Sequence, residues 1–184
     1  MIIQSHNRIL NTRGMLKGVL LFLCWFLVWA GIPSNNNEYD VKAMFVYNFT
    51  KYVEWPETSD PVVFRIAVCG NSDIIPVLQS IAQKKNIGTK KIEIVILPPG
   101  EITSCQILFV PKSESHLLEE LARKCQGKGI LIVSEECRNA GKGAAINLVN
   151  ANSKIRFDIY LSAARSAGVK ISSQLTSLAL NVNP

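Results

Sequence analysis

The chain has 184 residues and a mass of 20.3 kDa, a length typical of one globular domain. Apolar residues make up 48% and charged residues 18%, a composition that supports a buried core and excludes a mainly disordered chain. The formal net charge is +6, and the two histidines, His6 and His116, leave few side chains for acid–base chemistry.

The first thirty residues have the pattern of an export signal. Three basic residues precede an unbroken apolar run of fourteen, Gly18–Gly31, and residues 1–30 contain no Asp or Glu. A membrane span needs about 20 apolar residues, so this run is short for a transmembrane helix and fits the core of a signal peptide. The pattern predicts a signal peptide over residues 1–30 with cleavage after Ala30. An uncleaved anchor is the alternative.

Removal of the leader changes the charge balance. It takes away three basic residues and no acidic one, so residues 31–184 carry a net charge of +3. This part has no stripe of Lys and Arg with interleaved aromatics, and we therefore do not expect nucleic acid as a partner. After cleavage the protein is not expected to span a membrane itself.

Four cysteines follow the leader, an even count that suggests disulfides in an exported protein. No Cys-x-x-Cys spacing occurs, which argues against zinc-ribbon and thioredoxin-type sites. Spacing alone does not decide the pairing, and four separate buried thiols are the alternative. The disulfide candidates are Cys69, Cys105, Cys125 and Cys137.

The mature part has the pattern of alternating helices and strands. After a polar lead-in at 31–37, helical spacing of apolar residues spans Glu38–Val53, and Trp55-Pro56 ends it because the residue before proline avoids the helical region. The later elements, in chain order, are a strand at Val62–Cys69, a helix at Asp73–Lys85, strands at Lys91–Leu97 and Gln106–Val110, a helix at Ser113–Cys125, a strand at Ile130–Ser134, a hairpin of Ala144–Val149 with Lys154–Asp158, a helix at Ile159–Ala167, an extended Val169–Ile171 and a last helix from Ser172 or Ser173.

This alternation predicts the α/β class: a single three-layer domain over residues 38–184, with a mixed β-sheet of about six strands flanked by helices. The link between Leu97 and Gln106 is short for a parallel crossover, which takes about a dozen residues. The hairpin near the C-terminus is antiparallel. We therefore expect parallel and antiparallel strands in one sheet.

Few residues have the spacing that catalysis or metal binding requires. His116 lies in an amphipathic helical pattern without a nucleophile motif, and no His/Cys/Asp/Glu cluster has metal-ligand spacing. The adjacent Glu135 and Glu136 are interpreted as solvated surface rather than as an acid–base pair. Gly127-Lys128-Gly129 and Gly141-Lys142-Gly143 precede strands, so they predict turns rather than phosphate loops. We expect no catalytic residue, no metal and no cofactor.

Five aromatic residues are concentrated in Met44–Pro56. Tyr47 falls on the outer side of the predicted helix and Trp55 follows it. Both residue types suit interfaces that are half apolar and half wet, so they are candidates for a recognition surface. The alternative is that all five aromatic side chains belong to the hydrophobic core or pack at its edge. Three share one helical face predicted to be core: Phe45, Phe49 and Tyr52.

The segment Tyr39–Pro56 resembles the opening signature of the YfiR-type periplasmic regulators, a family formerly known only as a domain of unknown function. Three further segments agree with that family: Phe64–Gly70, Cys105–Val110 and Ile155–Leu180. The resemblance covers about Tyr39 to Val182, which is nearly the whole mature chain.

The resemblance implies a periplasmic, non-enzymatic α/β domain that can form a homodimer. Characterised members bind the periplasmic part of an inner-membrane diguanylate cyclase and hold it inactive, which lowers cyclic-di-GMP and biofilm formation. By family position it also implies Cys69–Cys105 as the first-choice disulfide. This chain has Ala67 where members often carry another cysteine.

We therefore expect a periplasmic regulator that represses an inner-membrane signalling protein, in keeping with cyclic-di-GMP control. The alternative is a periplasmic small-ligand-binding protein, because a three-layer α/β sheet offers a crevice at its strand ends. The candidate contact or ligand residues are Tyr47, Trp55, Lys170 and Ser172.

Overall fold

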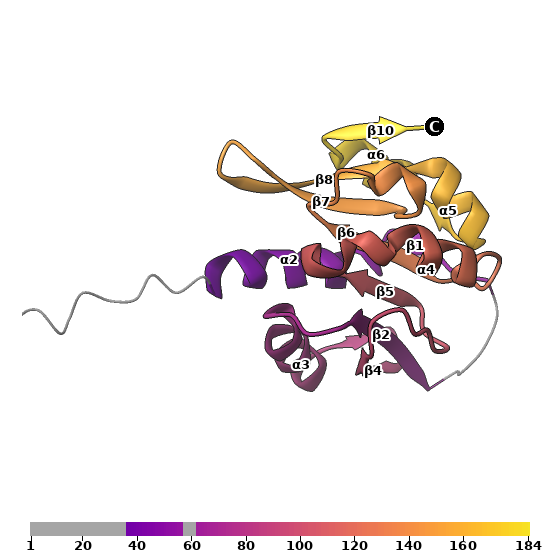
Figure 1. Ribbon diagram of the computed structural model, residues 1–184. Helices are drawn as coiled ribbons and strands as arrows, with labels where there is room; N and C mark the ends of the chain where they lie inside the picture. The colour runs from indigo at the N-terminus through magenta and orange to yellow at the C-terminus, as the bar shows by residue number, and fades with distance from the viewer. Residues whose placement is uncertain (1–35, 57–61) are drawn as a thin grey trace, which may run out of the picture. The chain divides into compact units, whose positions relative to one another are not determined.

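Among residues 36–56 and 62–184, which are those that the computed structural model describes, eight strands form one mixed sheet at the centre of the fold (Figure 1). The predicted signal peptide at 1–30 lies outside the described residues. Two further short strands pair separately as a small second sheet. The strands in chain order are β1 (Val53–Glu54), β2 (Val63–Cys69), β3 (Asn86–Ile87), β4 (Lys90–Leu97), β5 (Ile107–Val110), β6 (Leu131–Glu135), β7 (Ile146–Ala151), β8 (Lys154–Tyr160), β9 (Lys170–Ile171) and β10 (Asn181–Asn183).

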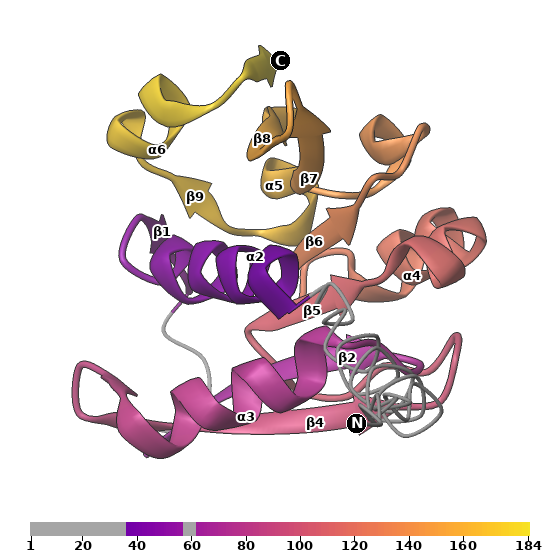
Figure 2. The same ribbon diagram turned by 90° about the vertical axis from the view of Figure 1, so that its left-hand side faces the viewer.

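Helices connect most of these strands and cover both faces of the sheet (Figure 2). They are α2 (Asn36–Phe49), α3 (Ile74–Lys84), the 3-10 helix η2 (Lys112–Leu117), α4 (Leu118–Cys125), the 3-10 helix η3 (Ala140–Lys142), α5 (Leu161–Ala167) and α6 (Ser173–Leu178).

The large sheet has the strand order β10-β8-β7-β6-β5-β2-β4-β3. Strands β4, β2, β5, β6 and β7 are parallel to one another, whereas β8 is antiparallel to β7 and β3 is antiparallel to β4. The short strands β1 and β9 pair separately as a two-stranded antiparallel ribbon. The predicted α/β class with a mixed sheet is confirmed.

The link from β4 to β5 is a parallel crossover, although its length suggested otherwise. Both strands pair with β2 in parallel. Leu97 at the end of β4 is level with Cys69, and Ile107 at the start of β5 is level with Ile66. Because β5 is short and begins near the middle of β2, the chain returns over little more than three residues of strand length. A helix is not needed for that distance.

The predicted sheet of about six strands lacks β3 and β10, which are too short to produce a pattern, and the equally short β1 and β9 pair outside this sheet. Strands β1, β3 and β9 have two residues each, and β10 has three. A strand is recognised in a sequence by alternation over four or more residues, which these segments cannot show. The pairing of β1, β9 and β10 is decided by neighbours that are distant in the chain, such as β8 for β10, whereas β3 pairs with the next strand, β4.

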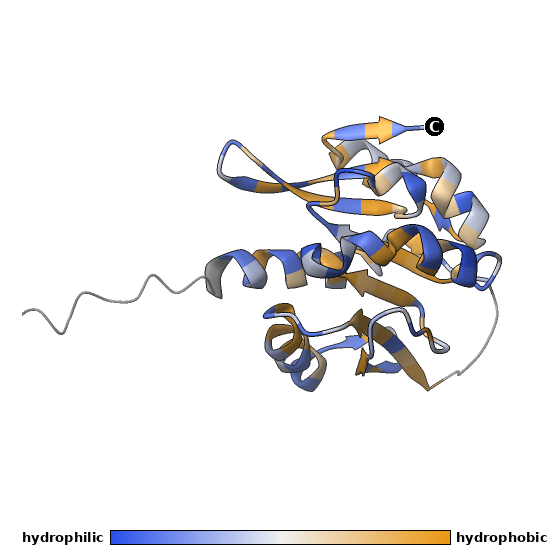
Figure 3. Ribbon diagram, viewed as in Figure 1, coloured by the Kyte–Doolittle hydropathy of each residue, from blue (hydrophilic) through white to orange (hydrophobic). Residues whose placement is uncertain are grey.

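Alternate residues of the strands enter two separate hydrophobic clusters, one on each face of the sheet. In β2, Phe64, Ile66 and Val68 face α2 and α3, whereas Ala67 and Cys69 face α4. Figure 3 shows the result as apolar strands in the middle of the sheet and a mostly polar outer side on α4. The three-layer arrangement follows from this double burial.

Three predicted helices differ from the structure, and one of them, Ile159–Ala167, begins only at Leu161 because β8 continues through Tyr160. Helix α2 begins at Asn36, inside the predicted lead-in 31–37, because a first helical turn can be wholly polar and then carries no apolar signal. It ends at Phe49 rather than Val53, because the Thr50 hydroxyl donates a hydrogen bond to Tyr47 O and the chain then pairs as β1. The predicted helix Ser113–Cys125 is divided into η2 and α4.

The C-terminal turns agree with the local sequence. Asn152 and Ser153 have φ of 52° and 59°, the two left-handed residues of the tightest hairpin turn, between β7 and β8. Gly168 ends α5 at φ 82°, and Ser172 caps α6 by accepting a hydrogen bond from Leu175 N.

Candidate interaction surface

Three of the four predicted contact residues lie at the β1–β9 ribbon. Glu54 of β1 stands opposite Lys170 of β9, Trp55 directly follows β1, and Ser172 directly follows β9. The backbone N–H of Ser172 donates to Tyr52 O at 2.9 Å, which continues the pairing. Tertiary pairing thus brings together residues that are more than one hundred positions apart in the chain.

The indole of Trp55 is held in one orientation. Its Nε1–H donates to the backbone oxygen of Gln106 at 2.9 Å, and its ring packs edge-on against Phe64 with centroids 5.1 Å apart. A half-buried Trp with its polar end satisfied presents a rigid apolar surface, which is the usual form of an interface anchor.

Trp55 also lines a cavity of about 560 Å³ at the start of β5 and β6. A volume in this range suits a small organic ligand or one anchoring side chain of a partner. Its wall combines apolar and polar groups, among them Ile102, Thr103, Ser104, Lys128 and Ile130.

The Gly127-Lys128-Gly129 turn forms one wall of this cavity and is a turn, as predicted. Both glycines have φ of 67°, in the region that glycine adopts without strain. Gly127 N donates to Ser166 O and Gly129 N donates to Ala167 O, so the turn is fastened to the end of α5. A Cβ on Gly129 would lie 2.8 Å from Cγ of Pro56, so only glycine fits beside the residue that follows Trp55.

The other predicted residues differ in what they can offer a partner. Lys170 is exposed, and no carboxylate of the described residues pairs with it. The Ser172 hydroxyl already caps α6, so its role in the structure is local. Tyr47 contacts the region between α3 and β3, where its hydroxyl donates to Asn86 O at 3.4 Å.

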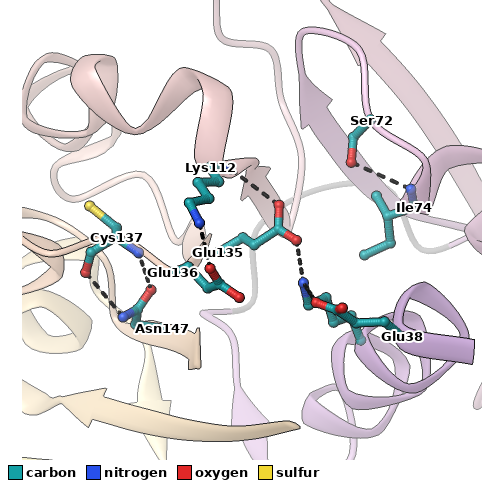
Figure 4. A network of polar contacts seen from close by, with 9 residues as sticks. Glu38, Ser72, Ile74, Lys112, Glu135, Glu136, Cys137 and Asn147 are labelled. Carbon is teal, nitrogen blue, oxygen red and sulfur yellow. Dashed lines mark hydrogen bonds and ion pairs between the residues drawn. The ribbon is translucent and has the colours of Figure 1, made fainter. Parts of the chain in front are cut away.

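A buried polar network that the sequence did not indicate lies where β6 ends (Figure 4). Lys42 of α2 is 2% exposed and Glu135 is 4% exposed, and Nζ of Lys42 donates to Oε1 of Glu135 at 2.5 Å. Glu38 is the second carboxylate partner of Lys42. Oε2 of Glu135 accepts from the backbone N–H of Lys112 at 3.2 Å. The network ties α2 to β6 and η2.

The interpretation of Glu135 and Glu136 as a solvated pair was therefore wrong for Glu135. The two side chains do point apart, but Glu135 turns inward to Lys42 and Glu136 turns outward to Lys112 at 2.7 Å. The hydrogen bond from Lys112 lowers the pKa of Glu136. Burial alone would lower the pKa of Lys42, but its hydrogen bonds to Glu135 and Glu38 outweigh burial and raise it. The sequence does show Lys42 four residues after Glu38, a spacing typical of an ion pair on a helix. That spacing does not indicate that Lys42 is buried.

A second polar group fixes the chain just after β6. Oδ1 of Asn147 accepts from the Ser134 hydroxyl at 2.8 Å and from Cys137 N at 3.1 Å, and Nδ2 donates back to Cys137 O at 3.2 Å. All three residues are buried. The Asn147 side chain thus satisfies the backbone N–H and C=O of Cys137, which no longer belongs to strand β6. We therefore interpret this network as structural.

Within the described part of the chain, the four cysteines are buried free thiols. Burial raises the pKa of Cys105 to about 12 and that of Cys125 to about 11. Such thiols ionise little at neutral pH and are poor nucleophiles. Among the same residues, no group of three His, Cys, Asp or Glu side chains is placed to hold a metal ion, and His116 is exposed on η2.

Residues 39–180 match the family model described as YfiR/HmsC-like. The chain belongs to the YfiR/HmsC-like family. The match runs from within α2 through α6 and therefore includes the β1–β9 ribbon, the cavity beside Trp55 and the buried pair of Lys42 with Glu135. Membership makes the chain a periplasmic regulator of cyclic-di-GMP signalling in general terms. None of the helices formed by the described residues is both long and apolar enough to cross a bilayer.

Proposed function

We propose that this protein binds the periplasmic domain of an inner-membrane diguanylate cyclase and represses it. Family membership over residues 39–180 is the observation that carries the proposal. The mechanism is a shift of populations: the regulator binds the inactive conformation of the cyclase better than the active one and thereby biases its output across the membrane.

The contact surface in this proposal is the β1–β9 ribbon with Trp55 and Lys170. Trp55 supplies a rigid, half-buried anchor, and Lys170 supplies an exposed charge on the neighbouring strand. An interface commonly depends on one or two such residues at its centre, and truncation of a Trp anchor costs on the order of 2 kcal/mol or more. Ser172 supports this surface by capping α6.

A complementation experiment tests the proposal. Deletion of the gene is expected to raise intracellular cyclic-di-GMP, and the wild-type gene is expected to restore the low level. The variants Trp55→Ala and Lys170→Glu are expected to fail in this. The control Lys154→Glu makes the same change of charge at another exposed position, on β8, and is expected to complement. Unchanged cyclic-di-GMP in the deletion strain would contradict the proposal.

Binding of a small ligand is a second candidate function, favoured by the cavity of about 560 Å³ beside Trp55. A screen of metabolites by thermal shift on the mature chain separates the two. A rise of several degrees with one metabolite, together with unchanged cyclic-di-GMP in the deletion strain, would favour the ligand-binding function.

A further inference from the structure

Five lysines gather where α2 and α3 end and β4 begins, and we name this group the lysine corner. Lys84 is the last residue of α3, and the short hairpin of β3 and β4 follows, with Asn86 opposite Lys91 and Ile87 opposite Lys90. Figure 2 shows the end of α3 and the start of β4 close to one another within the described domain. The members are Lys51, Lys84, Lys85, Lys90 and Lys91, of which all but the half-buried Lys90 are exposed.

Tyr47 of α2 lies between Lys51, which follows α2, and Lys85, which follows α3. Its ring lies under Nζ of Lys51 at 5.1 Å and under Nζ of Lys85 at 5.4 Å, measured to the ring centroid. Its hydroxyl donates to Asn86 O. Two ammonium groups are thereby held near one aromatic ring, although they come from different parts of the chain.

The charge of the lysine corner is not compensated within the described residues. Lys42, Lys112, Lys124 and Lys142 each lie within 4.0 Å of a carboxylate oxygen, whereas no lysine of the corner does. The corner carries five positive charges, and residues 31–184 together carry a net +3. The other residues of 31–184 together therefore carry a net charge of −2, so the corner holds a local excess of positive charge.

Protection of the sheet edge explains only part of this arrangement. Lysines beside an edge strand deter sheet-to-sheet association, and β3 is an edge of the large sheet. This accounts for Lys90 and Lys91. It does not account for Lys84 and Lys85 at the end of α3 or for Lys51 after α2, which lie outside the strands.

We propose that the lysine corner docks the protein on the anionic phospholipid headgroups of a bilayer surface. Ammonium groups on flexible stems are point charges that suit a diffuse layer of phosphates, whereas an arginine fork suits one carboxylate or phosphate held in a defined geometry. Tyr47 and Ile87 are partly buried against the core beneath the lysines, so the ammonium groups themselves make the contact with the headgroups. Docking of this kind requires no defined pocket that selects one small anion, and this also fits contact with the extended surface of a bilayer.

Docking at this corner would place the regulator at the membrane from which its partner projects, but it does not depend on the proposed function. Each lysine near an anionic surface contributes about 1 kcal/mol, and this attraction is screened beyond about 8 Å at physiological salt. The four exposed lysines of the corner therefore support reversible binding that weakens as salt increases.

Flotation with lipid vesicles tests the proposal without any protein partner. Mature wild-type chain is expected to float with vesicles of equal parts phosphatidylglycerol and phosphatidylcholine, and not with phosphatidylcholine alone. Lys84→Glu/Lys85→Glu is expected to weaken binding by roughly 30-fold or more, because two contributions are lost and reversed. Lys154→Glu/Arg156→Glu has the same change of net charge on exposed residues of β8 and is expected to keep most of the affinity.

The neutral variant Lys84→Gln/Lys85→Gln gives an intermediate result if the corner is the docking site, and an unchanged melting temperature shows that each variant is folded. Absence of flotation at low salt overturns the proposal. An equal loss in both charge-reversal variants also overturns it, because net charge and not the corner would then be responsible. If the corner variant loses cyclic-di-GMP repression while vesicle binding is unchanged, the corner belongs to a protein interface and lipid docking is wrong.

Discussion

Nζ of Lys42 lies 2.5 Å from Oε1 of Glu135, 93 residues further along the chain, and both side chains are almost fully buried. The pair joins the first helix of the domain to the end of a central strand. Removing one member would leave the other charge buried without its main partner, which is among the more costly changes a core can undergo.

Lys42→Met is expected to lower the free energy of unfolding by about 3–5 kcal/mol, because Glu135 then loses its buried counter-charge. Denaturant unfolding of the mature chain measures the change. The matched control is Lys124→Met, which breaks the exposed pair with Glu120 and is expected to cost less than about 1 kcal/mol. An equal loss of unfolding free energy in the two variants would contradict the prediction, because the buried pair would then contribute no more to stability than the exposed pair.

The free energy of unfolding is expected to fall at alkaline pH, and ionisation of Cys105 is one cause. Burial raises the pKa of Cys105 from 9.0 to about 12, so the folded state keeps the proton that the unfolded state has lost. The stability that the neutral thiol contributes is fully present below pH 9 and is lost as the pH rises from 9 toward 12. The loss is at most about 1.4 kcal/mol for each pH unit. Cys105→Ala is expected to flatten this part of the curve, measured by denaturant unfolding at several pH values.

Labelling of thiols tests the predicted disulfides. The four cysteines are buried and free, so iodoacetamide at pH 8 is expected to label none in the folded mature chain and four after unfolding without reductant. Mass spectrometry counts the labels. A count of two together with a cross-linked Cys69–Cys105 peptide would instead establish the pairing that family position implies.

Gly129→Ala is expected to be more destabilising than Gly88→Ala. Both glycines have a left-handed backbone, at φ 67° and 58°, so each substitution carries a strain of about 1–2 kcal/mol. A Cβ at Gly129 also meets Pro56 at 2.8 Å, whereas a Cβ at Gly88 has no atom within 4 Å among those described. An additional loss of about 1 kcal/mol or more is therefore expected at Gly129. Thermal unfolding measures both, and equal shifts would contradict the contact with Pro56.

Trp55 provides an intrinsic probe of the interaction surface. The other two tryptophans of the chain, Trp25 and Trp29, fall in the predicted leader, so residues 31–184 contain Trp55 alone. Its emission is expected to shift when the periplasmic domain of a cyclase is added to the mature chain. Lys170→Glu is expected to weaken that titration several-fold, and Lys128→Ala, in the cavity wall, is expected to leave it unchanged. If Lys128→Ala weakens the titration and Lys170→Glu does not, the partner contacts the cavity wall rather than the β1–β9 ribbon, and the proposed contact surface is wrong.

The amino-acid sequence was sufficient to predict the α/β class, the long strands, the end of α5 before Gly168, the start of α6 at Ser172 or Ser173, and the family, because each depends on periodicity or on short local patterns. Only the tertiary structure decided the β1–β9 ribbon that sets Glu54 opposite Lys170, the burial of Lys42 with Glu135, and the grouping of lysines around Tyr47. These depend on contacts between residues far apart in the chain, and strands of two residues carry no periodicity. A charged side chain looks the same in a sequence whether water or a buried partner surrounds it.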